Sequence, residues 1–343
     1  MFTIINPVDY PKWDDLLLAN PEHSFFHSSC WARVLSESYG YTPCYFTTIH
    51  DNRLAALIAV MEIRSIIRGK RGVSLPFTDY CEPIISEGHP FQEMMSELIK
   101  HGKQSGWKSI EIRSGKKVSR ETPPSSFYYG HILNLPKGQD ALFSNLRDST
   151  KRNIRKAEKE GVSVRLHSSP ESVSEFYRLN CLTRKMHGLP PQPSSFFRKV
   201  YQHIISKGHG FVALALHEGK TVAGAVYFNF GNKALFKYGA SDKRYQHIRP
   251  NNLIMWEAIK WYGQKGYTTL CFGRTEPENK GLRQFKAGWG TEEHVVNYYK
   301  YDLIKESYIK DSLKVRGFHN KVFATMPMPL LRITGSLLYK HMG

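Results

Sequence analysis

Short runs of apolar, β-branched and aromatic residues, each bounded by polar turns, predict the strands of this chain. The first half carries two such runs, Tyr45–Ile49 and Leu54–Met61, with four polar residues between them. The second half carries Phe211–Leu216 and Val222–Phe230, again with a short polar turn between, and Lys233–Tyr238 comes next. Each half is therefore expected to contain a β-hairpin.

Apolar residues at helical spacing predict the helices. Trp31, Val34 and Leu35 share one side of a helix that should end near Gly40, with Ser28 or Ser29 as its N-cap. Further helices are expected over residues 146–161, 172–184, 195–206 and 251–263. The last of these is apolar almost all round, which predicts burial, so Glu257 within it needs a partner, either Lys260 or a group outside the helix.

The two halves repeat one another. The turn at residues 50–53 aligns with residues 217–220, and an offset of about 160 residues superposes Pro90 on Pro250, Met95 on Met255 and Gly106-Trp107 on Gly266-Tyr267. Each half thus predicts a hairpin, a helix begun by proline, a glycine stop and a further strand. We expect two similar α/β (α+β) domains with mixed, mostly antiparallel sheets and a cleft between them. The predicted division is 1–140, 141–302 and a basic tail, 303–343.

The composition of the chain limits the cellular location and the kinds of binding partner that we expect. The 343 residues contain no apolar run of 18 residues, and the Met1 end lacks a secretory pattern, so a cytoplasmic location is expected. Five scattered cysteines and the unclustered histidines indicate neither a disulfide framework nor a metal site. The net charge of +18 favours polyanionic partners, although a surplus that serves only solubility is an alternative.

Two basic segments give that charge a local pattern. Arg152, Arg155, Lys156 and Lys159 share one face of the helix at 146–161, which indicates either a solvated face or contact with a polyanion. In the tail, Leu330, Ile333 and Leu337 line one face of a short helix after a Met-Pro-Met-Pro break. This pattern predicts contact with an anionic membrane surface or a partner, and packing on the protein's own surface is the alternative.

Two loops carry candidate chemistry. Asp79 and Tyr80 come after the segment Ser74-Leu75-Pro76-Phe77-Thr78, as a functional pair or as a simple turn with an anchoring tyrosine. Residues 281–290 are expected to form a loop after a strand at 268–272, which delivers Arg274.

The order of elements in each half is that of a GNAT-type acyltransferase domain. A user of acyl-CoA should have a glycine-rich turn before its central helix, but residues 246–252 contain no glycine and Pro250 removes a donor.

Three segments resemble the FemAB family of non-ribosomal peptidyltransferases, which are built of two GNAT-like domains. They are Arg152-Asn153-Ile154-Arg155-Lys156-Ala157 with Gly161-Val162, Pro250-Asn251-Asn252 with Trp256-Glu257, and Gly281-Leu282 with Phe285-Lys286 and Gly288-Trp289-Gly290. The resemblance covers roughly residues 24–301. It implies transfer of an aminoacyl group from aminoacyl-tRNA to an amine of a lipid-linked peptidoglycan or envelope-polysaccharide precursor, with no bound cofactor.

The same resemblance implies roles for single residues. Lys286 would stabilise the oxyanion of the tetrahedral intermediate, and Asp79 is our candidate for assisting the departure of the amine's proton. The candidate substrate-binding residues are Tyr80, Arg152, Arg155, Lys156, Tyr238, Asn252, Glu257, Arg274, Arg283 and Phe285.

The sequence departs from the family at two places. Leu35 stands where bridge-forming members commonly carry a lysine that grips a substrate phosphate, which shifts that role to Arg33, Arg152 or Arg155. The long helical arm of some relatives is absent, because residues 172–206 are too few for it. Two alternatives therefore stay open: an N-acyltransferase that uses acyl-CoA or acyl-carrier protein, and a basic scaffold without activity.

Overall fold

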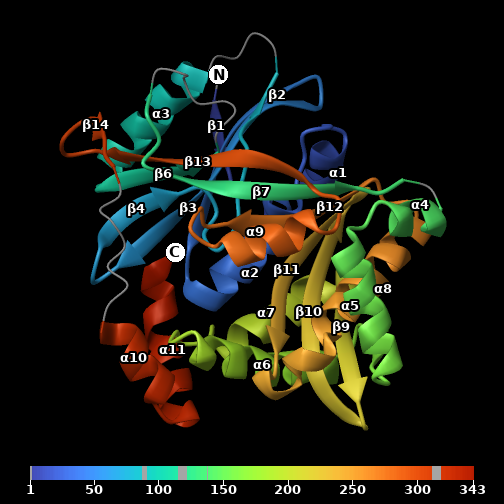
Figure 1. Cartoon of the computed structure of the whole chain (residues 1–343). Helices are drawn as coiled ribbons and strands as arrows, with labels where there is room; N and C mark the ends of the chain where they lie inside the picture. Colours follow the sequence, from blue (N-terminus) through green and yellow to red (C-terminus); the bar gives the residue numbers. More distant parts are fainter. Residues whose placement is uncertain (1, 87–90, 115–121, 137, 311–317) are drawn as a thin grey trace. The chain divides into compact units, whose positions relative to one another are not determined.

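The computed structural model describes residues 2–86, 91–114, 122–136, 138–310 and 318–343 (Figure 1). The chain forms two compact units, each assembled from separate stretches of sequence. Unit 1 comprises Met1–Tyr129, Val295–Lys314 and Tyr339–Gly343, and unit 2 comprises Gly130–His294 and Val315–Leu338. The division expected from the sequence, 1–140, 141–302 and 303–343, treats each domain as one contiguous stretch.

Unit 1 is a sheet with helices packed on it. Its elements are β1 (Thr3–Ile5), α1 (Trp13–Leu18), α2 (Ser29–Tyr39), β2 (Thr42–His50), β3 (Arg53–Ser65), β4 (Gly69–Val73), β5 (Ile84–Ile85), α3 (Phe91–Gln104), β6 (Ser109–Arg113), the start of β7 (Ser126–Asn134), most of β13 (Glu292–Asp302) and β14 (Ser307–Tyr308). The strands β1, β2, β3, β4, β6 and β13 neighbour one another in that order. The strand β13 is thus supplied by chain that comes after most of unit 2.

Alternation along β2 divides the core of unit 1 between two faces. Cys44 and Phe46 pack into a cluster with Met94 and Leu98 of α3. Tyr45 points to the other face and meets Trp13 of α1, with ring centroids 5.6 Å apart. The helix predicted around Trp31 is confirmed as α2. As expected, the Ser28 side chain caps it, and Gly40 ends it in the left-handed conformation.

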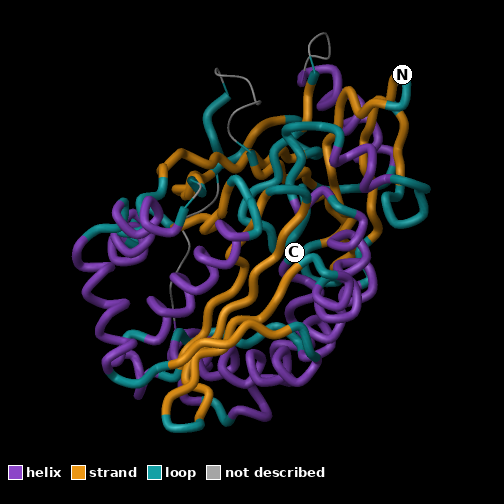
Figure 2. The backbone as a smooth tube through the Cα atoms, turned by 90° about the vertical axis from the view of Figure 1, so that its right-hand side faces the viewer, coloured by secondary structure: helices purple, strands orange, loops and turns teal. Residues whose placement is uncertain are grey.

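Unit 2 repeats this plan. Its elements are α4 (Gln139–Ser144), α5 (Asp148–Lys159), β8 (Ser163–His167), α6 (Pro170–Met186), α7 (Ser194–His203), β9 (Gly210–His217), β10 (Lys220–Phe230), β11 (Lys233–Ser241), the short 3-10 helix η3 (Lys243–Ile248), α8 (Pro250–Gln264), β12 (Thr269–Thr275), α9 (Lys280–Ala287), the end of β7, the start of β13, and α10 (Phe318–Thr325). Its strands have the order β7, β12, β11, β10, β9, β8. Helix α8 packs against β9 and β10, and α6 packs on the same strands, with the strands running between helices in Figure 2.

The internal repeat is preserved as pairing geometry. In unit 1, the parallel ladder between β4 and β6 joins Arg71–Val73 to Ser109–Glu111. In unit 2, the parallel ladder between β11 and β12 joins Lys233–Leu235 to Thr269–Cys271. Both ladders are three residues long and begin at the same place in each copy, which fits the duplication inferred from the sequence.

The sequence misjudged the bounds of some helices and strands. Most of residues 281–290 are helical, because α9 spans Lys280–Ala287 and Asn279 caps it through its side chain. Strand β12 continues to Thr275, so Arg274 lies within a strand instead of a loop. The strands β7 and β13 were not anticipated. The polar, proline- and serine-rich composition of residues 115–126 suits an interdomain loop, and of these residues 115–121 lie outside the described part of the chain.

The tail packs on the protein through a face other than the one expected. Helix α11 (Met328–Met342) buries Leu331 and Tyr339, and a side-chain atom at Gly335 would meet the carbonyl of Pro191. Leu330, Ile333 and Leu337 do share a face, as predicted, but they are 54%, 56% and 61% exposed. Among the described helices, none is both long and apolar enough to cross a bilayer.

Candidate active site

The two central parallel strands of unit 2 separate close to Arg274, one of the predicted site residues. The ladder between β11 and β12 stops at the pair Leu235–Cys271, although β11 continues to Ser241 and β12 to Thr275. Beside this point, the pairing of β10 with β11 shifts register across Phe236–Tyr238, so Lys237 forms a β-bulge. Bulges of this kind re-aim side chains and are frequent next to active sites. The carboxyl end of β12 is therefore the centre of the candidate site.

Lys286 lies at this end of β12 and is almost completely buried. Its exposed fraction is 3%, and its Nζ donates hydrogen bonds to the carbonyl oxygens of Gly273 and Arg274, both at 3.0 Å. Burying an ammonium is costly unless such acceptors surround it. The two carbonyls fix the position of a positive charge at the separated strands, as an oxyanion-stabilising group requires.

Local packing and backbone conformation explain why two glycines and a tryptophan follow Lys286. Gly288 accepts a hydrogen bond from the Thr150 hydroxyl at 2.9 Å, and a Cβ at Gly288 would lie only 2.6 Å from that hydroxyl. Trp289 is fully buried, with its ring 6.0 Å from that of Phe285. Gly290 has φ +76, in the left-handed region. The motif thus locks α9, and with it Lys286, onto the start of α5.

A buried histidine and an ion pair stand next to Lys286. Nε2 of His131, on β7, lies 3.1 Å from Oε2 of Glu293, whose carboxylate accepts two hydrogen bonds from Arg283, at 2.7 and 3.0 Å. Burial, and after it the positive charge of Lys286, lowers the pKa of His131 to about 4, although Glu293 opposes the shift. Hydrogen bonds from Arg283 hold the pKa of Glu293 below its usual range despite some desolvation. His131 is therefore neutral at physiological pH.

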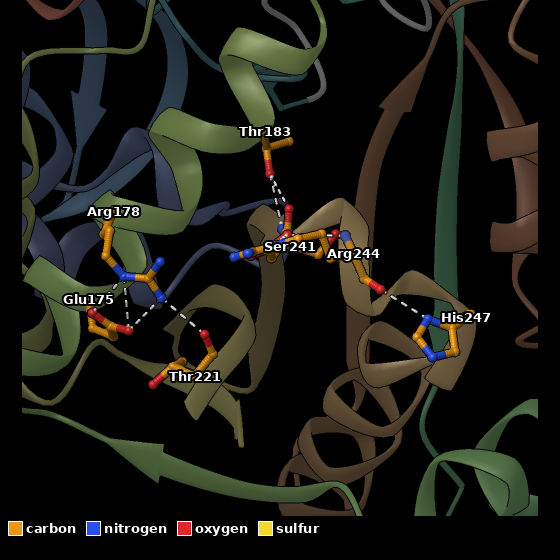
Figure 3. A network of polar contacts seen from close by, with 8 residues as sticks. Glu175, Arg178, Thr183, Thr221, Ser241, Arg244 and His247 are labelled. Carbon is orange, nitrogen blue, oxygen red and sulfur yellow. Dashed lines mark hydrogen bonds and ion pairs between the residues drawn. The ribbon is translucent and has the colours of Figure 1, made fainter. Parts of the chain in front are cut away.

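Side chains hold the turn between β11 and α8 in place of a glycine-rich loop (Figure 3). The Thr183 hydroxyl donates to the carbonyl of Ser241 at 3.1 Å and accepts from its N–H at 3.0 Å. Arg244 pairs with Asp242 at 2.6 Å, and its carbonyl lies 3.0 Å from Nδ1 of His247. Such a turn leaves few bare N–H groups for a pyrophosphate at the start of α8.

Tyr238 packs in an aromatic cluster behind that turn, with its ring centroid 5.6 Å from Phe197 and 6.3 Å from Phe196. Asn252 is buried in the first turn of α8. Glu257 finds the partner expected within its own helix, since its carboxylate lies 2.7 Å from Nζ of Lys260. The positions of Glu257 and Tyr238 are accounted for by packing and local pairing.

The basic face of α5 is exposed as expected. Arg152, Arg155, Lys156 and Lys159 all point to solvent, while Ile154 and Ala157 bury the opposite side of the helix. The Arg155 guanidinium lies 5.6 Å from the centre of the Phe143 ring. Helix α5 therefore carries the basic surface and also Thr150, whose hydroxyl donates a hydrogen bond to the carbonyl of Gly288.

Asp79 and Tyr80 belong to unit 1, whereas the other predicted site residues belong to unit 2. Their loop contains two non-glycine residues in the left-handed region, Leu75 at φ 45 and Phe77 at φ 60. Arg113 helps hold it by donating to the carbonyl of Leu75 at 3.3 Å. Strained backbone of this kind persists only where its surroundings impose it, and it is common at functional sites.

Tyr80 packs beside Tyr128, Val296 and Tyr298. The Tyr298 hydroxyl donates to the carbonyl of Asp79 at 2.5 Å.

Each unit has an open groove. The groove of unit 2, of about 430 Å³, is lined by Leu142, Asn145, Gly290 and their neighbours. The groove of unit 1, of about 830 Å³, is lined by residues of α1 and the β2–β3 turn. Of the predicted site residues, none lines either groove in the described part of the chain.

His131 and Glu293 did not emerge from the sequence. They lie on β7 and β13, 162 positions apart, and neither strand was predicted. The only sequence signal was a polar residue inside an apolar run, Tyr128–Leu133, which is typical of a buried histidine with a specific partner.

Several known proteins are similar to this chain in sequence. The family model described as an acetyltransferase (GNAT) domain matches residues 144–292. The lipid II:glycine glycyltransferase of Staphylococcus epidermidis is 32% identical over 288 residues, which is 72% of this chain and 68% of that protein. The Staphylococcus aureus (strain USA300) protein of the same name is 31% identical over 103 residues, 26% of this chain and 24% of that protein.

Solved structures share the fold. The crystal structure of FemX has a TM-score of 0.65 at 14% identity and covers 87% of this chain and 96% of that one. A tandem GNAT protein from the clavulanic acid biosynthesis pathway has a TM-score of 0.57 at 11% identity, over 88% of this chain and 98% of that one. Fold and sequence together define a transferase built of tandem GNAT-like domains.

The chain belongs to the FemAB family, the family of the lipid II:glycine glycyltransferases. The resemblance inferred from the three sequence motifs, the fold class and the enzymatic nature of the protein are thereby confirmed.

Proposed function

We propose that this transferase moves an aminoacyl group from aminoacyl-tRNA to an amine of a lipid-linked cell-envelope precursor. The observation that carries the proposal is the burial of Lys286 at the end of β12, with its ammonium fixed by two backbone carbonyls at 3.0 Å. A fixed cation at separated strands suits a reaction in which negative charge develops on a carbonyl oxygen.

The proposed reaction is aminolysis of an ester. The amine of the acceptor attacks the carbonyl carbon of the aminoacyl ester, and a tetrahedral intermediate forms with negative charge on its oxygen. The C–O bond to the tRNA ribose then breaks, the amide remains, and the ribose hydroxyl takes up a proton equivalent to the one that the amine loses. Lys286 would stabilise the oxyanion, which is worth about 3 kcal/mol for a group of this kind, and Asp79 would assist the loss of the amine's proton.

The donor would bind through positive charge. The α5 face, with Arg152, Arg155 and Lys156, is exposed and lies on the helix that holds Gly288. A tRNA brings a dense array of phosphates, and lysine and arginine side chains bind it by releasing counterions. Arg274, Arg283 and Phe285 are the candidates closest in sequence to Lys286 for contacts with the ester end.

The acceptor is proposed from the name of the relatives, lipid II:glycine glycyltransferase. Leu35 is fully buried in α2 and therefore offers nothing to a phosphate, whereas Arg33 donates to the carbonyl of Val8 at 3.4 Å. This favours the α5 arginines for binding a phosphate. A lipid-linked acceptor would place the enzyme in the cytoplasm, peripherally at the inner face of the membrane.

A second candidate, an N-acyltransferase that uses acyl-CoA, is favoured by the match to the acetyltransferase domain. The start of α8 argues against it. Arg249 occupies the left-handed region at φ 60 where a glycine would be expected, and Pro250 provides no N–H group. A CoA pyrophosphate would therefore find fewer backbone donors than usual.

The experiment is a transfer assay with the full chain and total lipid-linked envelope precursors. Label is supplied in parallel on a pool of aminoacyl-tRNAs and on acyl-CoAs, with heat-treated protein as the blank. We expect label to reach the lipid fraction only from tRNA, and competition with single unlabelled aminoacyl-tRNAs then names the amino acid. Label from CoA alone would establish the second candidate and contradict the first.

A further inference from the structure

The turn between β3 and β4 presents two consecutive isoleucines to solvent. Ile66 is 92% exposed and Ile67 is 65% exposed, while the strands beneath them are mostly buried. A pair of such residues at a protruding tip has no role in the core, and exposed apolar clusters of this kind mark interaction sites.

The tip has a defined conformation. The Ser65 hydroxyl accepts hydrogen bonds from the N–H groups of Ile67 at 3.2 Å and Arg68 at 3.1 Å. Ser65 and Gly69 close the β3–β4 ladder beneath it, and Gly69 has φ +74, which only glycine adopts readily. The backbone therefore holds both isoleucines outward in a fixed turn.

Basic residues flank the two isoleucines in the sequence. Residues 62–71 contain Arg64, Arg68, Lys70 and Arg71 with one acid, Glu62. Glu62 accepts from Nε1 of Trp107 at 2.7 Å and lies within 3.3 Å of both Arg64 and Lys70. The exposed Arg68 next to Ile67 thus adds to a local surplus of cations at the base of the tip.

The last turn of α11 is anchored to the same strand pair. Nη2 of Arg71 donates to the carbonyl of His341 at 3.0 Å, and the Tyr41 hydroxyl lies 3.2 Å from the carbonyls of Tyr339 and Lys340. All of these residues belong to unit 1. Helix α11 leaves Leu330, Ile333 and Leu337 exposed, and no acid occurs in residues 318–343, which carry Lys321, Arg332 and Lys340.

We propose that the β3–β4 tip inserts Ile66 and Ile67 into the surface of an anionic lipid bilayer, with Arg64 and Arg68 at the headgroups. A convex tip with two apolar side chains suits a fluid lipid surface, whereas a stable protein interface needs roughly 800 Å² on each partner. Apolar insertion and basic residues together give reversible binding to anionic membranes.

The test is sedimentation of the full chain with vesicles of phosphatidylcholine alone or with one third phosphatidylglycerol. Wild-type protein should bind the anionic vesicles at least tenfold more tightly than the neutral ones. Ile66→Ser with Ile67→Ser should weaken that binding about tenfold. Ile304→Ser is the matched control, because Ile304 is 76% exposed at another turn of unit 1, between Asp302 and Glu306.

Unchanged vesicle binding by the Ile66→Ser, Ile67→Ser variant would overturn the proposal. So would self-association of the wild-type protein that the same variant abolishes without any change in vesicle binding. The proposal does not depend on the donor: the tip variant should still transfer to a water-soluble amine acceptor. Failure of vesicle binding and failure of transfer are therefore separate results.

Discussion

The two units share a sheet plan but differ in the segments that extend beyond their central parallel strands. In unit 1, β4 ends at Val73 and gives way to the strained loop that carries Asp79 and Tyr80. In unit 2, the equivalent β11 continues to Ser241 through a bulge at Lys237. Past β12 the chain forms α9, which buries Lys286 against the end of that strand.

This difference lies outside the part of the fold that the two units share. The ladders β4–β6 and β11–β12 are both parallel and both three residues long, so this pairing does not distinguish the copies. The copies differ in the segment beyond the ladder, which is a carboxylate on a strained loop in one unit and an ammonium on a helix in the other. Under the proposed function, the chemistry would reside in these segments, because the shared fold is the same in both units.

The two cores differ at one repeated position. Gly72 of β4 lies beneath Trp107, and a Cβ there would approach the indole to 2.1 Å. The matching residue of β11 is Ala234, and Tyr267 stands in the place of Trp107. Gly72→Ala should lower the free energy of unfolding by about 2 to 3 kcal/mol through overpacking. Denaturant titration measures this, and Ala234→Gly, the reverse change in unit 2, should cost less than about 1 kcal/mol. Equal losses would mean that the two cores are packed alike.

His131 should make the stability of the protein depend on pH. Its pKa of about 4 lies below the ordinary value of 6.5, so the unfolded chain binds the proton more readily than the folded one. The stabilisation is therefore complete above pH 6.5 and is lost as the pH falls toward 4. Relative to His131→Gln, the wild type should lose about 3 kcal/mol over that window, because each pKa unit of difference between the folded and unfolded chain is worth about 1.4 kcal/mol.

The measurement is the free energy of unfolding at several pH values, with His50→Gln as a control at an exposed histidine of unit 1. Identical pH profiles for wild type and His131→Gln would show that neither burial nor the charge of Lys286 lowers the pKa of His131.

Asp79 tests whether unit 1 contributes to the reaction. Asp79→Asn keeps the size of the side chain and removes the base, so we expect kcat/KM for transfer to fall about tenfold, with the loss reduced at higher pH because solvent then accepts the proton more readily. Asp51→Asn changes an exposed aspartate in a turn of the same unit and should have no effect. A fall equal in size at every pH would indicate a positioning role for Asp79.

The basic face of α5 should give the smallest effect. Arg152→Glu with Arg155→Glu should weaken binding of tRNA several-fold and reduce the slope of log affinity against log salt by about 1 to 2, because fewer counterions are released. Filter binding at several salt concentrations measures this. Arg198→Glu on α7 reverses one exposed charge of the same unit, and an equal loss for each reversed charge would mean that only net charge matters.

Periodicity predicted the elements whose signal is local. The hairpin strands, α2 and α8 were expected close to their observed bounds, because alternation, caps and glycine stops lie within each segment. The repeat then gave the two-domain plan, since Trp107 and Tyr267 end equivalent helices. The motif around Lys286 was also recognisable from sequence.

The rest depended on contacts between distant segments. Strand β13 pairs with β6, although 178 residues separate Arg113 from Glu292, and no local pattern encodes such a partner. His131 and Glu293 lie on the strands missed for this reason. The sequence predicted correctly that Leu330, Ile333 and Leu337 share one face of α11. It did not predict that a neighbouring face, with Leu331 and Tyr339, is the buried one, because burial depends on contacts with distant parts of the chain.

The central claim is that the reaction centre of this transferase lies at Lys286 in unit 2. The most direct test is the single-turnover rate of aminoacyl transfer by Lys286→Ala, beside Lys280→Ala at the exposed start of the same helix. We predict that Lys286→Ala slows the chemical step roughly 100- to 1,000-fold, while its circular dichroism spectrum and its affinity for tRNA stay those of the wild type. A folded Lys286→Ala protein that transfers at the wild-type rate would contradict the account.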